Sequence, residues 1–387
     1  MGTGDAEPRT RGAQTGTGDK PRGARAPGVK DVAALAGVSV GTVSNVINSR
    51  GTVRDTVRER VEDAIKELGY VPNPTAQALR RGVSPVVGVA VFDLTNPFFM
   101  EAAAGIERRL SDEGCVMSLA STHSDPAREA DLLRTLAGQA VRGILLTPAD
   151  TDLTVARELV KRGIPLVLFD FPDTPVDISS ISIDDRAGAT LAIEHLLALG
   201  HRRLLFLNGP VSVRQARSRA CGVEDAISHW NDRESSHSSF STPAVMLETV
   251  NVEDFSVNAG RSWMRAYLKE QGLRPNTSGP QTPTNPLMKN LPTGIFCAND
   301  LIAFGAMMAL RDAGLRVPED VSVVGFDDIS MAADMPTPLT TIRQPMEELG
   351  TEAVDLLFKS SNPNSSVVHL KFYPRLIVRR STAAPSC

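Results

Sequence analysis

The chain has 387 residues, of which 42% are hydrophobic and 22% are charged, and its formal net charge is −4. This size and composition are typical of a globular protein with more than one domain. The chain contains no apolar run long enough to span a bilayer and no apolar signal-peptide core, so we expect a cytoplasmic protein without membrane contact.

The four cysteines, Cys115, Cys221, Cys297 and Cys387, are far apart and form no CxxC pair. This spacing disfavours a disulfide framework or a zinc site and fits a reducing compartment. We expect neither a metal site nor a cofactor.

The first segment and the division of charge set the N-terminal part of the chain apart. Residues 1–28 are rich in Gly, Thr, Arg and Pro, and we expect them to be disordered. Residues 1–82 hold 13 Lys and Arg against 9 Asp and Glu (+4), while the remainder holds 28 against 36 (−8), which together restore −4. This division of charge fits a protein in which only the N-terminal part contacts the phosphates of a nucleic acid. Ordinary variation in charge between domains gives the same asymmetry.

Residues 29–48, VKDVAALAGVSVGTVSNVIN, predict two short helices joined by a tight turn at Gly37 and Val38. The expected apolar faces are Val32, Leu35 and Ala36 in the first helix, and Val43, Val46 and Ile47 in the second. Ser39 is a candidate N-cap for the second helix. Two such helices form a helix-turn-helix, whose second helix can lie in a DNA major groove; a plain αα-hairpin in a helical bundle is the alternative.

A third helix is expected to close this small domain over residues 29–70. Its apolar face consists of Val57, Val61, Ala64, Ile65 and Leu68, and it ends at Gly69. The expected N-cap residue of this helix is Arg54, which has no side-chain oxygen to cap the helix. The negative charge of Asp55 in the first turn compensates through its favourable interaction with the helix dipole. The candidates for contact with DNA phosphates are Arg50, Arg54, Arg58 and Lys66. The alternative for each of them is a solvated surface charge without a nucleic-acid partner.

Residues 71–82 read as a hinge. Pro72 and Pro74 interrupt the helices, and residues 75–82 predict a helix too short to be stable alone in water. We expect this helix to order only against DNA and a second copy of the chain. By spacing alone Leu79 is a core residue; the alternative is an apolar wedge between base pairs in the minor groove.

From Pro85 onward apolar strands alternate with amphipathic helices. Strands are expected at 86–92, 116–120, 143–146, 165–169, 178–183, 204–208, 293–297 and 321–325, and helices at 98–110, from 126, at 153–162, 186–199, 219–228 and 301–313. Residues between 228 and 293 read as irregular, with polar surface loops at 231–243 and 275–292. This alternation predicts parallel sheets covered on both faces, and the length of the body predicts two lobes.

Ligands of such sheets bind at the carboxyl ends of the strands. Polar and aromatic side chains follow the expected strands at Asp93, Asn96, Phe98, Phe99, Asp170, Phe171, Asn299, Asp300, Asp327 and Asp328. Carboxylates, amides and aromatic faces can bind a hydroxylated ring. The alternative is that these residues cap the following helices, and for Asn299 and Asp300 the two interpretations are equally supported.

At this point the residues resemble a known family. DVAALAGVSVGTVSNVIN, followed by RERVEDAIKELGYVPNPTAQALRRG, resembles the head and hinge of the lactose-repressor (LacI/GalR) family of bacterial transcription regulators. In the body, LTNPFF, PLVLFD, HRRLLFLNGP, IFCANDLIAFGAM, DVSVVGFDD and PLTTIRQP look like landmarks of that family's core, which is similar to periplasmic sugar-binding proteins.

The resemblance implies an α/β fold in which a three-helix DNA-binding domain and a hinge helix precede a two-lobed, periplasmic-binding-protein-like core with parallel sheets. The core would span residues 83–387. Lobe 1 would hold about 83–183 and 345–372, and lobe 2 about 184–344 and 373–382, with crossings near Ile183, Gln344 and Phe372.

The resemblance also implies site residues. DNA contacts fall on Ser39, Val40, Gly41, Thr42, Ser44, Asn45, Asn48, Arg58, Asn73, Ala76 and Leu79, and Leu79 takes the position of the family's minor-groove wedge. Effector contacts fall on Asn96, Phe98, Phe99, Asp170, Arg219, Asn299, Asp327 and Gln344. Of the two phenylalanines, we expect one to belong to the lobe core.

The DNA-reading helix departs from the family in two ways. Many members carry Arg where Asn45 stands, and bulkier polar residues where Val40 and Gly41 stand. Asn pairs with adenine N6 and N7, whereas Arg prefers guanine. The resemblance therefore implies DNA binding but not the operator sequence.

We expect a cytoplasmic homodimeric repressor controlled by a small-molecule effector, a mono- or oligosaccharide or a derivative, that either induces or corepresses. The tail after Arg380 has no leucine heptad, so a dimer is the default. No GxxxxGK[ST], GxGxxG, GxSxG or HExxH motif is present, so we do not expect an enzyme. The alternative is an intracellular sugar-binding or sugar-processing protein with a vestigial head.

Overall fold

The computed structural model describes residues 27–47, 53–71, 84–237, 244–273, 291–362 and 364–386. The chain divides into two compact units, Met1–Arg80 and Arg81–Cys387. Among the described residues, none of the helices combines the length and the hydropathy that a membrane crossing needs.

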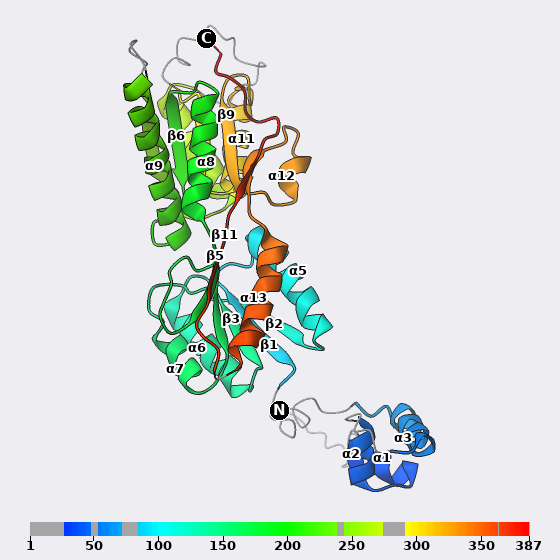
Figure 1. Ribbon diagram of the computed structural model, residues 1–387. Helices are drawn as coiled ribbons and strands as arrows, with labels where there is room; N and C mark the ends of the chain where they lie inside the picture. The colour runs from blue at the N-terminus through cyan, green and yellow to red at the C-terminus, as the bar shows by residue number, and fades with distance from the viewer. Residues whose placement is uncertain are drawn as a thin grey trace, which may run out of the picture. The chain divides into compact units, whose positions relative to one another are not determined.

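The described residues of the N-terminal unit form three helices, α1 (Val29–Ala36), α2 (Val40–Ile47) and α3 (Asp55–Leu68) (Figure 1). Its small core consists of Val32, Ala33, Ala36, Val43, Val46, Val61 and Ala64. The prediction for Leu35 was wrong, because this side chain is 46% exposed. The buried face of α1 follows the spacing i, i+3, i+4 and i+7 from Val29, which places Ala33 rather than Leu35 in the core.

Backbone caps fix the tight connection between α1 and α2. Gly37 ends α1 with a left-handed φ of 62°, which a glycine adopts without steric cost. Ser39 caps α2, as predicted, because its Oγ accepts a 3.1 Å hydrogen bond from the Thr42 amide. Arg60 of α3 donates through Nη2 to the Ala36 carbonyl at 2.9 Å, so the third helix holds the turn in place.

The C-terminal unit contains two six-stranded sheets (Figure 1). The first has the order β11-β5-β4-β3-β1-β2 and is built from β1 (Val86–Val91), β2 (Val116–Ser121), β3 (Gly143–Leu146), β4 (Leu166–Phe169), β5 (Ser179–Ile183) and β11 (His369–Phe372). The second has the order β12-β10-β9-β8-β6-β7 and is built from β6 (Arg203–Asn208), β7 (Met246–Asn251), β8 (Gly294–Cys297), β9 (Ser322–Asp327), β10 (Thr340–Arg343) and β12 (Arg375–Ile377).

Among the described strands, every pairing is parallel except that of β10 with β12. The predicted two-lobed core with parallel sheets is therefore confirmed. The chain leaves the first sheet after β5, returns after β10 and leaves again after β11. These passages lie at Asp184, at residues 344–345 and at residues 373–374.

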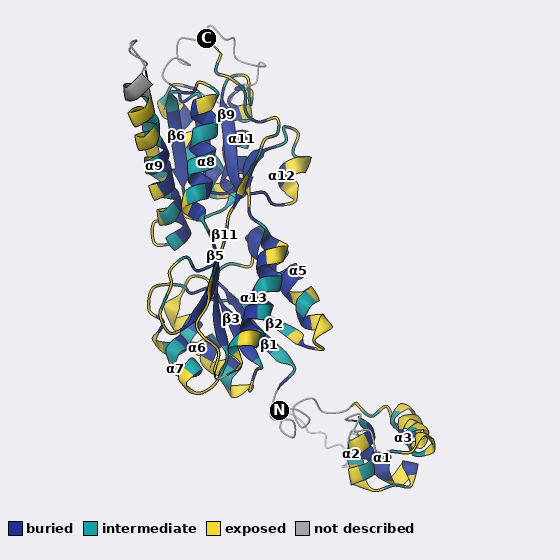
Figure 2. Ribbon diagram, in the orientation of Figure 1, coloured by how far each residue is buried: buried dark blue, intermediate teal, exposed yellow. Residues whose placement is uncertain are grey.

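Helices cover the sheets, whose inner strands form the buried layer (Figure 2). The first lobe holds α5 (Pro97–Asp112), α6 (Pro126–Gly138), α7 (Thr154–Lys161) and α13 (Met346–Ser360). The second holds α8 (Asp185–Ala198), α9 (Arg214–His237), α10 (Val257–Glu270), α11 (Asp300–Asp312) and α12 (Met331–Asp334). Helix α6 begins at Pro126, as predicted, and Asp125 caps it.

Helices α5 and α13 touch backbone to backbone. A Cβ on Gly105 would lie only 2.2 Å from the Glu347 carbonyl oxygen, and a Cβ on Gly350 only 2.2 Å from that of Ala102. Glycine at both positions therefore allows an approach that any side chain would prevent. This contact fixes α13, which follows the second passage between the lobes, against α5, which begins beside the site described below.

Two expectations about the region after residue 228 were wrong. The stretch read as irregular contains β7 and α10, and residues 231–237 continue helix α9 instead of forming a loop. Strand β7 lies at a sheet edge and is only partly buried, so it lacks the apolar run that marked the other strands. Residues 238–243 and 274–290 lie outside the described residues.

The C-terminal tail extends across the second sheet. Val323 and Ser381 exchange two bonds: the Val323 amide donates to the Ser381 carbonyl at 2.8 Å, and Ser381 Oγ donates to the Val323 carbonyl at 2.6 Å. His201, buried at the end of α8, bonds to the Ala383 carbonyl through Nε2 at 2.9 Å. The tail is thus a fixed part of the second lobe.

Candidate functional site

The first candidate site is the outer face of α2 in the helix-turn-helix. Ser39, Val40, Gly41 and Asn45 are exposed, and Thr42 and Ser44 are half-buried. Val43 and Val46 bury the opposite face against the other two helices. Local spacing alone therefore presents the predicted base-reading residues to solvent. Of the remaining predicted DNA contacts, Arg58 is half-buried on α3, and Asn48, Asn73, Ala76 and Leu79 lie outside the described residues.

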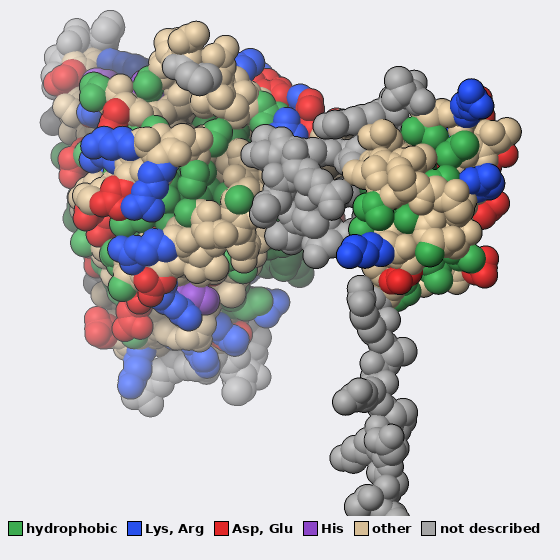
Figure 3. All heavy atoms as spheres, turned by 90° about the horizontal axis from the view of Figure 1, so that it is seen from below, with side chains coloured by type: hydrophobic (Ala, Val, Ile, Leu, Met, Phe, Trp, Pro, Cys, Tyr) green, Lys and Arg blue, Asp and Glu red, His purple; other side chains and the backbone are tan. Residues whose placement is uncertain are grey.

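The described part of the N-terminal unit carries no excess of positive charge. Its five basic residues are Lys30, Arg54, Arg58, Arg60 and Lys66, against six Asp and Glu. In the view of Figure 3 the Lys and Arg side chains visible on the described surface of the unit lie apart from one another. The other eight of the 13 Lys and Arg in residues 1–82 (13 − 5) belong to flanking segments. Attraction to phosphate must therefore come largely from outside the three helices.

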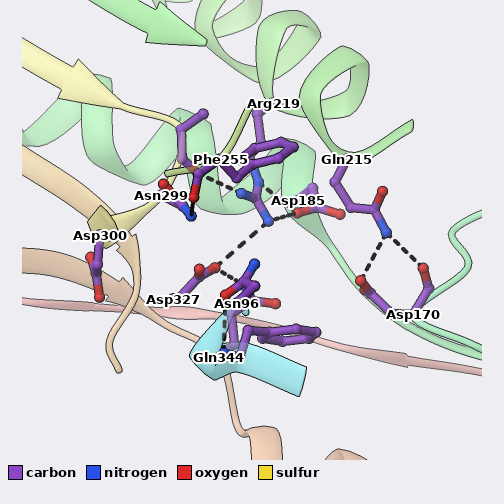
Figure 4. A network of polar contacts seen from close by, with 12 residues as sticks. Asn96, Asp170, Asp185, Gln215, Arg219, Phe255, Asn299, Asp300, Asp327 and Gln344 are labelled. Atoms are coloured by element: carbon purple, nitrogen blue, oxygen red, sulfur yellow. Dashed lines mark hydrogen bonds and ion pairs between the residues drawn. The ribbon is translucent and has the colours of Figure 1, made fainter. Parts of the chain in front are cut away.

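The second candidate site is a pocket between the two lobes of the core, drawn in Figure 4. All eight residues that the sequence singled out as effector contacts line it: Asn96, Phe98, Phe99, Asp170, Arg219, Asn299, Asp327 and Gln344. Phe92, Val213, Gln215 and Phe255 complete the lining, and about 300 Å³ of space remains, including the open mouth. The strands of both sheets end at this pocket, which brings distant residues together. The assignment of these residues as effector contacts stays a prediction.

Among the residues that the structure describes, Arg219 of α9 is the only cationic side chain in this lining. Its Nε donates to Asp185 Oδ1 at 2.8 Å, and its Nη1 donates to the Ala298 carbonyl. The guanidinium lies 3.8 Å from the centre of the Phe326 ring, an orientation favourable for a cation–π contact. Arg219 therefore has a fixed plane, and its Nη2 is 3.9 Å from Asp327 Oδ1 (Figure 4).

Asp327, at the end of β9, lies on the second-lobe side of the pocket. Gln344 donates to its Oδ1 at 2.5 Å. Burial, assisted by the negative charges of Asp185 and Glu101, raises the pKa of Asp327 to about 7, although Arg219 and Gln344 act in the opposite direction. Its backbone has a left-handed φ of 113°, which is rare for a residue with a side chain and is held here by the surrounding lobe.

Asp170 follows β4 and connects the two lobes. Gln215, near the start of α9, donates through Nε2 to Asp170 Oδ2 and to the Asp170 carbonyl, both at 2.8 Å (Figure 4). Burial and the nearby charge of Asp185 raise the pKa of Asp170 well above its ordinary value. The first lobe thus supplies the acceptor and the second lobe the donor of this bridge.

Two of the amides in the pocket also cap helices. Asn96 Oδ1 accepts from the Phe98 amide at the start of α5, and Asn299 Oδ1 accepts from the Ile302 amide at the start of α11. Capping uses one oxygen of each side chain and fixes its direction. The capping interpretation of Asn299 is therefore confirmed, and it coexists with a place in the pocket.

Phe98 and Phe99 both belong to the core of the first lobe and both line the pocket. Their rings meet edge to face with centroids 5.0 Å apart. The expectation that only one of the two is a core residue was wrong, because α5 begins at the lobe surface and both rings turn inward from its first turn.

Five residues at or next to the pocket were missed from the sequence: Phe92, Val213, Gln215 and Phe255 in the lining, and Asp185 behind it. Gln215 stands four residues before Arg219, so helical spacing could have placed it on the same face. Asp185 is the first residue of α8, directly after a passage between lobes. Phe255 lies in the stretch that was read as irregular, and no local signal marked it.

Comparisons with known proteins find matches for both units of the chain. The family model described as bacterial regulatory proteins, lacI family, matches residues 28–73. The model for periplasmic binding proteins and the sugar-binding domain of the LacI family matches residues 84–234, and a periplasmic binding protein-like domain matches residues 193–382.

Individual relatives extend the likeness along the chain. The chain is 34% identical to the ribose operon repressor of Escherichia coli (strain K12) over 356 residues, which cover 91% of this chain and 99% of that protein. A lac repressor dimer bound to operator and the anti-inducer ONPF has a TM-score of 0.77 and 29% identity, and the match covers 93% of this chain and 100% of that chain. A LacI family regulator from Enterococcus faecium with bound ribose has a TM-score of 0.64 and 28% identity, covering 78% and 100%.

Proposed function

The chain belongs to the lacI family of bacterial regulatory proteins, and we propose that it is a transcriptional repressor whose affinity for operator DNA changes when a sugar binds between its two lobes. The observation that carries this proposal is the convergence of eight predicted residues from both lobes on one pocket, in a chain that begins with a helix-turn-helix. The domains follow as residues 29–70 for DNA binding, 71–82 for the hinge and 83–387 for the core.

On this proposal α2 enters the major groove, and a homodimer places two copies of it on the halves of a near-palindromic operator. A lac repressor dimer bound to operator is a solved structure with the same fold, which supports this arrangement. Asn45 has the bidentate amide that suits adenine, so each half-site should prefer an adenine at its position. Leu79 wedges into the minor groove when the hinge segments of two copies pair.

The effector is a monosaccharide. The pocket offers carboxyl groups, amides and one guanidinium to hydroxyls, and Phe98, Phe99 and Phe255 to the C–H faces of a ring. Most of the 300 Å³ is open mouth, and the enclosed space of about 20 Å³ holds little more than one water, so a sugar ring enters only when the lobes move apart, and a second ring would require a wider opening. A ribose operon repressor among the relatives and a ribose-bound structure among the neighbours support a pentose-sized ligand.

Ligand and operator are coupled through the lobes. A sugar bonded to Asn96 and Asp170 on one side and to Arg219 and Asp327 on the other favours one arrangement of the lobes. That arrangement sets the separation of the two hinges in the dimer. Because coupling is reciprocal, operator binding must change sugar affinity by the same factor as sugar changes operator affinity.

We further propose that this regulator acts in the cytoplasm and has no enzymatic activity. Two measurements test it together. A thermal-shift screen of monosaccharides on the purified chain should find a ligand that raises the melting temperature by mass action. A gel-shift titration with genomic fragments should find specific binding that the same sugar strengthens or weakens.

Removal of residues 1–82 separates the proposed regulator from a sugar-processing protein. The shortened chain should keep the sugar-induced rise in melting temperature and lose specific DNA binding. Turnover of the bound sugar by the shortened chain, with no specific DNA binding by the full chain, would contradict the proposal.

A further inference from the structure

The space between the lobes is divided into two compartments. The inner one is the pocket already described, and a second, outer one of about 570 Å³, including its open mouth, adjoins it. The two share Phe92, Asp170, Val213 and Gln215 in their linings. The boundary between the compartments therefore lies at the bridge from Gln215 to Asp170.

This bridge is rigid at both ends. Gln215 is the second residue of α9, a helix of 24 residues, and the turn before it is closed by the bond from the Val213 amide to the Pro210 carbonyl at 2.9 Å. Asp170 directly follows β4, and the next amide, that of Phe171, bonds to the Ile181 carbonyl of β5 at 3.2 Å. Both side chains are buried, so neither can swing aside into solvent without breaking two hydrogen bonds.

The outer compartment has the lining of a sugar subsite. Hydroxyls come from Ser124 and Thr151, a carboxylate from Asp150, and an aromatic ring from Phe171. Arg214 covers one face of that ring, with its guanidinium 4.5 Å from the ring centre, and is paired with Asp173. Polar acceptors beside an aromatic face match a hydroxylated ring.

An anionic group fits this compartment less well. Arg214 already pairs with Asp173, and Arg217 donates to the carbonyls of Val211 and Ser212. Asp150 adds a negative charge to the lining. A phosphate would have to displace these partners and approach a like charge, whereas a neutral ring would not.

We propose that Gln215 sets the size of the effector: by bonding Asp170 it closes the inner pocket around one sugar ring and excludes glycosides whose second ring would occupy the outer compartment. This inference rests on the proposed function. Gln215 is thus a specificity-determining residue. Phe92, Asp170 and Val213 also line both compartments, but Gln215 is the side chain whose hydrogen bonds join the two lobes across this boundary.

The test is isothermal titration of the full chain and its Gln215→Ala variant. The probes are D-ribose, its two phenyl ribosides, 5-O-benzyl ribose and ribose 5-phosphate, which extend the ring in different directions. Wild type should bind D-ribose and none of the extended probes. The variant should bind D-ribose within about tenfold of wild type and gain at least about tenfold for one or more neutral extended probes.

Two further variants keep the result interpretable. Gln215→Ser shortens the same side chain but keeps a polar group, so it should show the same gain even if the alanine variant folds poorly. Gln344→Ala is the matched control, because Gln344 also donates to an aspartate but lines only the inner compartment. It should weaken D-ribose binding and gain nothing for the extended probes.

The outcomes separate the two claims. Two outcomes would overturn only the role of Gln215 in separating the compartments. In the first, the proteins bind D-ribose but neither Gln215 variant gains affinity for an extended probe. In the second, wild type binds D-ribose and a phenyl riboside equally well. A gain confined to ribose 5-phosphate would overturn the assignment of the outer compartment to a neutral ring. No binding of D-ribose by any of the four proteins would overturn the pentose as effector and the size limit that depends on it.

Discussion

Arg219 and Asp185 form an ion pair in the interior of the second lobe, where their side chains are only 6% and 1% exposed. Nε and Nη2 of the arginine both lie 2.8 Å from Oδ1 of the aspartate, while Oδ2 has no hydrogen-bond partner among the described residues. Asp185 lies behind the guanidinium and does not line the pocket. It therefore acts as a positioning residue for the arginine that the sequence singled out.

The first prediction concerns this pair. Asp185→Ala should lower the free energy of unfolding by about 3–5 kcal/mol, because it removes the carboxylate that is hydrogen-bonded to the buried guanidinium and leaves only the more distant Asp327, 3.9 Å away. Urea denaturation of the purified chain measures the change. The double variant Asp185→Leu, Arg219→Met should lose much less than the sum of the two single losses. Additive losses would show that the two side chains stabilise the lobe independently.

The second prediction concerns the pKa of Asp327, which burial raises to about 7. Sugar hydroxyls that donate to this carboxyl group favour its ionised form, so sugar affinity should fall as the pH drops through 7, by at most about tenfold per unit. Titration calorimetry between pH 6 and 8 measures this dependence. Asp327→Asn keeps the shape of the site and should bind sugar with no such dependence on pH.

Two variants complete that experiment. Asp327→Ala should abolish the rise in melting temperature that the sugar causes. Asp131→Asn, on the exposed face of α6, should behave as wild type. If Asp327→Ala keeps the full thermal shift, the effector does not bind in this pocket.

The third prediction concerns His201, which holds the C-terminal tail through Ala383. Its pKa is lowered to about 4, first by burial and then by the charges of His195 and Arg202, although the bond to Ala383 opposes this. The folded chain thus favours the neutral ring, whereas the unfolded chain binds a proton near pH 6.5. The contribution of His201 to the stability of the folded chain is therefore complete above pH 6.5 and is lost as the pH falls toward 4.

Between pH 7.5 and pH 5 this loss should amount to about 2 kcal/mol in the free energy of unfolding. Buried carboxyl groups titrate in the opposite sense, so the informative quantity is the difference between wild type and His201→Gln at each pH. That difference should shrink as the pH falls. His229→Gln, at an exposed position of α9, should keep the wild-type dependence, and a constant difference for His201→Gln would refute the assignment.

The fourth prediction concerns Leu79, which lies outside the described residues. If Leu79 wedges between base pairs, Leu79→Ala should weaken specific operator binding by at least about tenfold, because the bent duplex loses the contact that offsets its unstacking. Sugar binding by the same variant should stay near wild type. A gel-shift titration gives the operator affinity, and unchanged affinity would argue against the wedge.

Fully buried elements could be predicted from the sequence more accurately than partly buried ones. Strands such as β3 and β4 are buried on both faces and carry continuous apolar runs, so their positions could be predicted to within a residue. Edge strand β7 and helix α10 could not, because partial burial leaves no run and no clear boundary. The exposed Leu35 shows the same limit. Helical spacing together with its hydrophobic side chain assigned Leu35 to the core, but Ala33 occupies that face of α1 instead.

The sequence by itself indicated the helix-turn-helix, because that motif depends on residue identity at fixed local spacing, and its resemblance to a known family implied eight of the residues that line the pocket. Only the tertiary structure decided how those residues are held. Asp185 and Arg219 are 34 residues apart, and Asp170 and Gln215 are 45 residues apart and in different lobes. Whether such groups meet depends on burial and on the closing of one lobe on the other, and these are properties of the folded chain that no local spacing encodes.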